Sequence, residues 1–219
     1  MFPLSDANPS RKFPLFNIII IVITSLVFFL QLSSADQEVF IFQYALVPAQ
    51  VDLADFATLI PFVTAIFLHG GFLHIISNMW FLWIFGDNIE GHFGWLTFVI
   101  LYFASGIIGN VAQYILMPDS PIPMLGASGA VAGILGAYLI LFPQAKIKTL
   151  VPYFGFISVI AIPASFMLGY WFVLQIISGA VTLPVGGAGG GVAFWAHVGG
   201  FLTGIIFAKS IQKPEQVLT

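Results

Sequence analysis

Residues 126–141 read GASGAVAGILGAYLIL, and this stretch decides how the chain can fold. On a helix, its small residues lie along two adjacent stripes, the first formed by Ser128, Ala132 and Gly136 and the second by Gly129, Gly133 and Ala137. Stripes of small residues let two helix backbones approach closely, which is typical of helix packing inside membranes. We therefore expect a helix that begins near Ser128 and packs directly on another smooth helix.

The composition of the whole chain also indicates a membrane-embedded protein. Apolar residues make up 59% of the 219 residues and charged residues only 7%, against about 25% charged residues in a soluble domain. A chain with so few charges cannot build a water-facing surface. Its length allows several spans of about 20 residues each, and no separate soluble domain. Cysteine is absent, which excludes disulfides, thiolate metal sites and a cysteine nucleophile.

Six hydrophobic runs have the length and the scarcity of Lys and Arg expected of membrane helices. They lie at 15–33, 71–90, 93–116, 126–142, 164–181 and 192–210. The predicted fold class is therefore an all-α membrane protein, a bundle of six transmembrane helices. The apolar segment 149–163 is interrupted by prolines and is too short to cross, so we expect it at the interface or packed on the bundle. A seventh span at this segment stays open.

Basic residues predict the orientation of the chain, because cytoplasmic loops collect Lys and Arg. They flank the first, fourth and sixth helices, at Arg11, Lys12, Lys146, Lys148, Lys209 and Lys213. Both termini are therefore expected in the cytoplasm, with 1–14 as an N-terminal tail, 15–210 as the six-helix membrane domain and 211–219 as a C-terminal tail. The acidic loop 34–60 is expected outside. Because no targeting peptide is recognisable, we expect a prokaryotic plasma membrane.

Polar residues within the predicted helices are candidates for function, since they are costly in a bilayer and usually face the bundle interior. His74 and Asn78 lie four residues apart near the outer start of the second helix, and therefore on one face. His197 lies just inside the outer end of the sixth helix, on the same face as Gly200 and Gly204. Packing this smooth face on the stripes of the fourth helix would bring His197 to Ser128, as a nucleophile and its base require.

The residues before Ser128 favour nucleophilic chemistry. The proline-rich stretch 117–127 is predicted to be an irregular loop dipping inward, which membranes tolerate where the loop is buried in protein or lines a wet cavity. Gly126 and Gly129 flank Ser128 in a turn at a helix N-terminus, where free backbone N–H groups stabilise an oxyanion. Taken alone, this turn is more simply a small-residue packing motif, and His74 and Asn78 an interhelical hydrogen-bond pair. Because these residues converge with His197, an active site is favoured over these structural interpretations.

Rival chemistries fit less well. A zinc site would draw on His69, His74 and His197, but the chain has no His-Glu-x-x-His, and on a helix His69 lies about 140° round from His74. An aspartyl protease needs two facing carboxylates, whereas Asp87 and Glu90 are expected at the inner end, in solvent. Transporters carry polar residues along a path, whereas here polarity clusters at one depth. No acid is expected near Ser128, so a Ser-His dyad is predicted rather than a triad.

These residues resemble the rhomboid family of intramembrane serine proteases over nearly the whole chain. The turn at Ser128 is similar to the nucleophile motif of the family, the run Ala196-His197-x-x-Gly200 to its histidine helix, and His69, His74 and Asn78 to its His-x4-His-x3-Asn element. The resemblance implies a six-helix fold with a water-filled site open to the outer face. It also implies an oxyanion hole formed by His74, Asn78 and the backbone N–H of Ser128.

Two positions depart from the family pattern. The first outer loop lacks the common Trp-Arg pair, and Ala132 occupies a position that is often aromatic beneath the catalytic histidine. The first departure bears on the stability of that loop, and the second on which side chain stacks against the histidine.

The sequence thus predicts a rhomboid-type serine endopeptidase that cleaves membrane proteins within or near their transmembrane helices. Ser128 is the expected nucleophile and His197 the base and acid, with supporting positions at His69, Gly126, Gly129, Gly200 and Gly204. No cofactor, metal or nucleic acid is expected, and the partners are the lipid bilayer and substrates with a transmembrane helix. Helix-breaking residues in the substrate should help, because an intact helix hides its carbonyls. The alternative is a catalytically silent membrane-protein binder or chaperone on the same fold.

Overall fold

The computed structural model describes residues 2–8, 10, 12–153, 156–183 and 191–211. Its helices and strands, in chain order, are β1 (Phe2–Asp6), α1 (Leu15–Ser33), α2 (Gln37–Tyr44), η1 (Pro48–Gln50), η2 (Phe56–Leu59), α3 (Pro61–Thr64), η3 (Ala65–Phe67), α4 (Phe72–Phe93), α5 (Trp95–Leu116), α6 (Ser128–Leu141), β2 (Lys146–Tyr153), β3 (Phe156–Pro163), α7 (Ala164–Thr182) and α8 (Phe194–Ile211). The basic residues Arg11 and Lys213, and the predicted tail from 212 onward, lie outside the described residues.

The six long helices predicted from hydropathy are present as α1, α4, α5, α6, α7 and α8, with ends that agree within three residues. By length and composition, α1, α5, α7 and α8 are each able to cross a membrane. The segment 56–67 and α4, which meet at a bend of 77°, form a fifth candidate span. The chain is therefore an integral membrane protein. Among the described residues the candidate spans number four or five, because α6 has only 14 residues.

The prediction of a wholly α-helical chain is wrong at one end of the molecule. The apolar segment at 149–163 belongs to an antiparallel hairpin, in which β2 pairs with β3 from Lys146↔Pro163 to Tyr153↔Phe156. On the other edge of β2 lies β1, which comes from the stretch predicted as an N-terminal tail. Ile, Val and Thr are frequent along β2 and β3, and β-branched side chains of this kind favour strands. Hydropathy alone does not separate such a hairpin from a short apolar helix.

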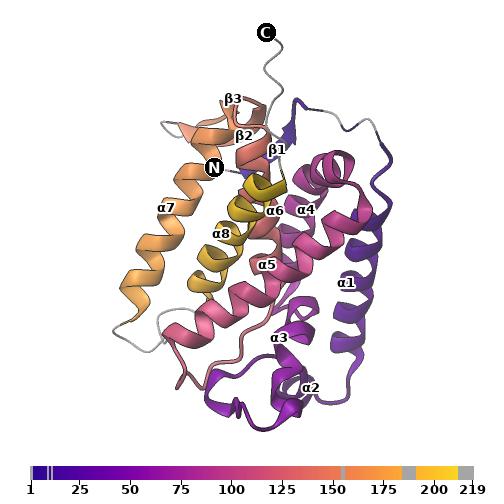
Figure 1. Cartoon of the computed structure of the whole chain (residues 1–219), viewed down its shortest axis with the longest axis vertical. Coiled ribbons are helices and arrows are strands. Elements are labelled where there is room, and N and C mark those ends of the chain that lie inside the picture. The colour runs from indigo at the N-terminus through magenta and orange to yellow at the C-terminus, as the bar shows by residue number, and fades with distance from the viewer. Residues whose placement is uncertain (1, 9, 11, 154–155, 184–190, 212–219) are drawn as a thin grey trace.

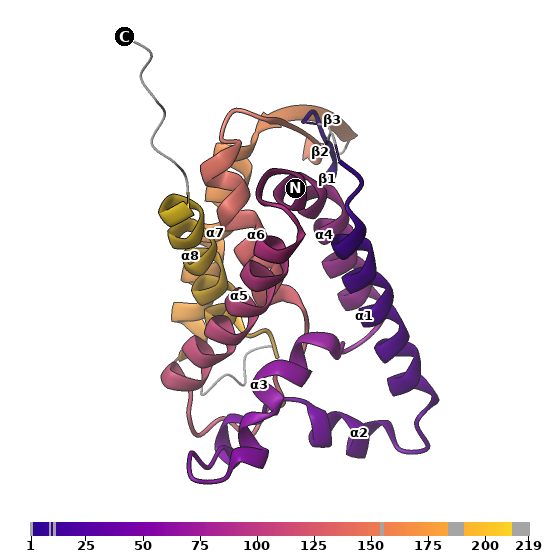
Figure 2. The same ribbon diagram turned by 45° about the vertical axis from the view of Figure 1, so that its right-hand side comes forward.

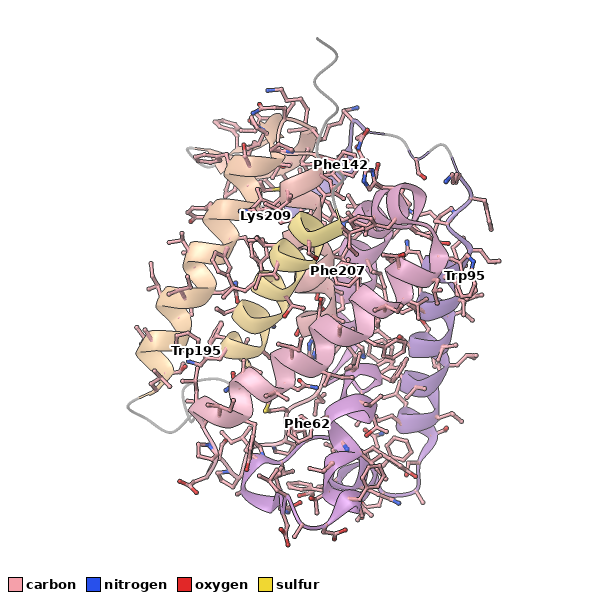
Figure 3. The ribbon with its side chains drawn as sticks, viewed as in Figure 1. Phe62, Trp95, Phe142, Trp195, Phe207 and Lys209 are labelled. Atoms are coloured by element: carbon pink, nitrogen blue, oxygen red, sulfur yellow. The ribbon has the colours of Figure 1, made fainter. Side chains whose placement is uncertain are left out.

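The two ends of the bundle differ in composition. In Figure 1 the sheet lies at one end, while α2 and α3 lie at the other. Lys209, at the end of α8, lies toward the sheet, and Trp195, at its start, lies toward the opposite end (Figure 3). Lys146 and Lys148 belong to β2, so these two residues and Lys209 gather at the sheet end. We name the other end, where α2 and α3 lie, the loop end.

The helix α6 is the centre of the fold. It contacts α4, α5, α7 and α8, and most of its residues are buried. In Figure 2, α4, α5 and α6 lie between α1 on one side and α8 on the other. The contact with α8 is made by backbone: a Cβ added at Gly200 would overlap the carbonyl group of Gly129, and one at Gly204 that of Gly133. The predicted direct packing of the two smooth faces is confirmed.

Glu90 is not the solvated residue that the sequence suggested. It is buried at 6% exposure, and its carboxylate oxygens accept hydrogen bonds from the backbone N–H groups of Phe16 (3.1 Å) and Asn17 (2.8 Å). These groups lie in the first turn of α1, which has no capping side chain of its own. A negative charge also suits the positive end of the helix dipole. Glu90 therefore caps α1 from α4.

The loop 34–60 is held to the stretch that precedes Ser128. Leu46 and Met124 form an isolated antiparallel bridge, with N–H···O distances of 3.0 and 2.7 Å. The N–H of Ala49 donates to the carbonyl of Ser120 at 3.0 Å. The hydroxyl of Thr64 donates to the backbone carbonyl of Tyr44 at 2.7 Å. Backbone pairing thus fixes this loop although it lacks the Trp-Arg pair.

Candidate active site

Ser128 and His197, predicted to meet, are in hydrogen-bond contact. The Oγ of Ser128, the first residue of α6, lies 2.7 Å from Nε2 of His197, which is near the start of α8. Both residues lie at the ends of the glycine-lined faces on which α6 and α8 pack. Beside the pair, a Cβ at Gly129 would lie 3.3 Å from the Ala196 carbonyl oxygen, so the two backbones are close there as well, although less tightly packed than further along. The distance fits proton transfer between a serine hydroxyl and its base.

The turn before Ser128 requires a glycine. Gly126 has φ of +129°, a conformation that side chains rarely allow. Its N–H donates to the carbonyl of Ala65 at 2.9 Å, and a Cβ at this position would lie 2.7 Å from Nε2 of His74. Gly126 thus lets the chain turn into α6 while His74 lies directly against it.

His74 and Asn78 lie on one face of α4 and reach the same space as Ser128. Nδ1 of His74 accepts a hydrogen bond from the N–H of Gly70 at 3.3 Å, which leaves the hydrogen of the neutral ring on Nε2. Nδ2 of Asn78 is buried and has no partner among the described residues. A buried donor without a partner is costly unless something else accepts from it. The site therefore has two side-chain donors that line the same cavity as the serine.

His69 does not take part in the cavity. It lies in the break between η3 and α4 rather than on the helix, so the angle expected between it and His74 is wrong: the two rings are 5.1 Å apart, edge to face. Its ring is buried, and Gln31 holds its backbone through two hydrogen bonds of 2.7 and 3.2 Å. His69 thus anchors the break before α4 and supports His74 from behind.

Two residues of α7 complete the surroundings of His197, and neither was predicted from the sequence. The Oε1 of Gln175 lies 2.8 Å from Nδ1 of His197. The ring of Trp171, one turn away, lies 5.9 Å from the imidazole at an interplanar angle of 30°. Trp171 provides an aromatic neighbour that Ala132 does not. A glutamine within an otherwise apolar membrane helix is a signal that was available, because such amides need a partner.

A cavity of about 480 Å³ lies at the site. Its polar wall is formed by His74, Ser77, Asn78, Ser128 and His197. Its apolar floor is formed by Val131, Ala132 and Leu135 of α6, Phe81 of α4 and Trp171 of α7. Ser128, Val131, Ala132 and Leu135 share one face of α6, so the cavity continues along that helix past the serine.

Comparison with known proteins identifies a family for this chain. A model of the rhomboid domain matches residues 57–213. Rhomboid protease GluP of Bacillus subtilis is 42% identical over 77 residues, which are 35% of this chain and 15% of GluP. The mitochondrial RHOMBOID-like protein 6 of Arabidopsis thaliana is 31% identical over 145 residues, or 65% of this chain and 40% of that protein.

The mitochondrial Rhomboid protein 1 of Saccharomyces cerevisiae is 30% identical over 167 residues, or 72% of this chain and 44% of that protein. The chain thus spans less than half the length of the curated relatives that it matches. The family model covers most of the chain, including every residue placed around the cavity. This chain belongs to the rhomboid family.

Proposed function

We propose that this protein is an intramembrane serine endopeptidase that cleaves membrane proteins within or beside their transmembrane helices. The observation that carries the proposal is the 2.7 Å contact between Ser128 Oγ and His197 Nε2, at the edge of a cavity into which His74 and Asn78 also point. A structural serine would be satisfied by a carbonyl of its own helix, as Ser25 and Ser33 of α1 are. Ser128 instead contacts a base.

The proposed reaction is acyl transfer. The hydroxyl oxygen of Ser128 attacks a substrate peptide carbonyl while His197 Nε2 accepts the hydroxyl proton. The resulting oxyanion accepts hydrogen bonds from Asn78 Nδ2, His74 Nε2 and the backbone N–H of Ser128, a free group in the first turn of α6. His197 then donates its proton to the leaving amine. Water, deprotonated by the same imidazole, releases the acyl group from Ser128.

The same proposal includes a topology of six spans with both termini in the cytoplasm of a prokaryotic cell. In it, α6 counts as a span that starts below the outer surface, because the irregular loop before Ser128 covers the remaining depth. The described basic residues at the sheet end support a cytoplasmic sheet, and the loop end then faces outward. The tails at 1–14 and 211–219 are part of this proposal.

The proposed nucleophile is tested by a fluorophosphonate, which labels only serines activated as nucleophiles. The protein in detergent is expected to be labelled at Ser128, as located by mass spectrometry of its peptides, and Ser128→Ala to remain unlabelled. Ser25→Ala serves as the control and should label like the wild type. Labelling at another serine would argue against the assignment. No labelling of the wild type would favour the alternative of a silent membrane-protein binder or chaperone.

Ala132 gives a prediction on specificity. Because it contributes only a methyl group to the cavity floor, we expect the site to accept a large apolar side chain next to the scissile bond. Ala132→Phe should reduce kcat/KM for a reporter with Leu at that position by about 10-fold or more, since a filled pocket discriminates by size. For the same reporter with Ala, kcat/KM should change little. An equal loss for both reporters would contradict a role of this floor in side-chain selection.

A further inference from the structure

The glutamine on α7 has the position of a third member of the catalytic arrangement. Gln175 is partly buried in the middle of α7, a helix with about half of its side chains exposed and few buried. Among the described residues, its contact with His197 is the one side-chain hydrogen bond that joins α7 to another helix. An amide at this depth needs a partner, because the bilayer offers none. The imidazole supplies it.

The contact decides which nitrogen of His197 carries the hydrogen. The amide nitrogen of Gln175 is turned toward the carbonyl of Trp171, one turn back in α7, at 3.5 Å, and the amide oxygen faces Nδ1 of His197. An oxygen is only an acceptor, so Nδ1 must carry the hydrogen. The lone pair of the neutral ring is then on Nε2, 2.7 Å from Ser128 Oγ. This is the tautomer that is able to accept the serine proton.

The same contact is suited to the charged form of the ring. When His197 has taken the serine proton, both ring nitrogens are donors, and the dipole of the Gln175 carbonyl continues to accept from Nδ1. A neutral amide does this without placing a permanent carboxylate in the bilayer, where a charge is expensive. Ala132 offers no polar or aromatic support to the ring, and Phe194 of α8 meets it edge to face at 6.3 Å, so the described hydrogen-bond partner at Nδ1 comes from α7.

We infer that Gln175 is a positioning residue that holds His197 in the tautomer and orientation required of the base, so that the site works as a Ser-His-Gln arrangement rather than a dyad. This inference rests on the proposed function for its kinetic consequence. The tautomer itself is independent of activity. Trp171 packs on the same ring from the preceding turn, and thus α7 as a whole orients the base.

The kinetic test uses Gln175→Leu, Gln175→Glu and, as a matched control on the exposed face of α7, Val173→Ala. Leucine keeps the volume but removes the acceptor, so kcat should fall by about 10- to 100-fold, as activity does when the hydrogen-bond partner of a metal-binding histidine is removed, with KM within about 2-fold. Glutamate restores an acceptor of the same length and should recover most of the lost kcat. Val173→Ala should behave like the wild type.

Thermal unfolding in detergent separates positioning from a structural role. An apolar leucine suits the membrane, so Gln175→Leu should unfold at or above the temperature of the wild type. If Gln175→Leu lowers the unfolding temperature and Gln175→Glu does not recover kcat, the residue is structural and the inference is overturned. An unchanged kcat in Gln175→Leu also overturns it.

A spectroscopic test holds even for a protein without activity. In protein with ¹⁵N-labelled histidine, the signals of His197 are assigned by their loss in His197→Ala, and the chemical shifts of Nδ1 and Nε2 show which one is protonated. The wild type should carry the hydrogen on Nδ1, and Gln175→Leu should shift the population toward Nε2. Equal populations in both proteins overturn the inference. A wild type that shows the Nδ1 tautomer but cleaves nothing overturns the proposed function alone.

Discussion

Ser128→Ala is expected to reduce cleavage of a single-span reporter in liposomes by about 10³-fold or more, to the background of the assay. Of the two serine hydroxyls that the described residues place at the cavity, that of Ser128 contacts a base and that of Ser77 donates to the carbonyl of His74, so the loss of Ser128 removes the chemical step and leaves substrate binding intact. His197→Ala should cause a loss of similar size, because an unactivated serine hydroxyl is a weak nucleophile at neutral pH. Cleavage is measured by gel separation of the two reporter fragments.

The double variant carries a further expectation. Since Ser128 and His197 act in one proton transfer, the combined loss should not exceed that of either single variant, as is found when residues act as a unit. Ser25→Ala, whose hydroxyl donates to the carbonyl of Ile21 in α1, is the matched control and should cleave normally. Undiminished cleavage by Ser128→Ala or His197→Ala would show that the pair is not the catalytic centre.

Gly204→Val is expected to have the largest effect on stability. A Cβ at this position would overlap the carbonyl oxygen of Gly133, a backbone atom that has no rotamer to adopt. The helices α6 and α8 would have to separate, with loss of the close packing along their faces. We expect a loss of about 3 kcal/mol or more in the free energy of unfolding, or no folded protein at all, which is at the upper end for overpacking.

The control for Gly204→Val is Gly169→Val. Gly169 lies in α7, and a Cβ there would meet nothing within 4 Å. Both substitutions place the same side chain in an apolar helix, so differences in helix propensity cancel. Unfolding by heat or denaturant in detergent, followed by circular dichroism, gives the comparison. Equal stability of the two variants would contradict the backbone contact between α6 and α8.

The central part of the site could be predicted because its cause is local in the sequence. Small residues repeat at helical spacing on both sides of the contact, from Gly129 to Gly136 and from Gly200 to Gly204, and this repetition fixes which faces meet. Once the faces are fixed, Ser128 and His197 follow as the polar residues at the ends of the stripes. His74 and Asn78 follow from a spacing of four residues. No long-range information is needed for these steps.

Other features depend on how distant elements are placed. Nothing near Phe16 in the sequence indicates that the first turn of α1 is capped, because the capping carboxylate of Glu90 comes from α4. Gln175 was missed for a related reason: hydropathy finds α7 but does not give its rotation about its own axis, so the residue that faces His197 is unknown. The elements were predictable here and their relative rotation was not.

The hairpin of β2 and β3 was not predicted because its apolar sequence is compatible with more than one secondary structure. An apolar run of moderate length satisfies a buried helix segment and a strand equally, and period alone does not decide between them. The partner strand β1 added a second difficulty, since residues 2–6 pair with β2 across more than half of the chain. His69 illustrates a smaller error, because the expected angle of about 140° assumed one helix through His69 and His74, whereas α4 begins at Phe72.

The contact of α6 with α8 also bears on mutational tolerance. The separation of Ser128 from His197 is set by two backbones in contact, and no large side chain lies between Gly129, Gly133, Gly200 and Gly204 to transmit a change made elsewhere. The outward faces of α1 and α7 are therefore free to drift in sequence, as a membrane of different thickness or lipid content demands, without displacing the pair. Substitution is constrained at the few glycine positions where even a Cβ would overlap the facing backbone.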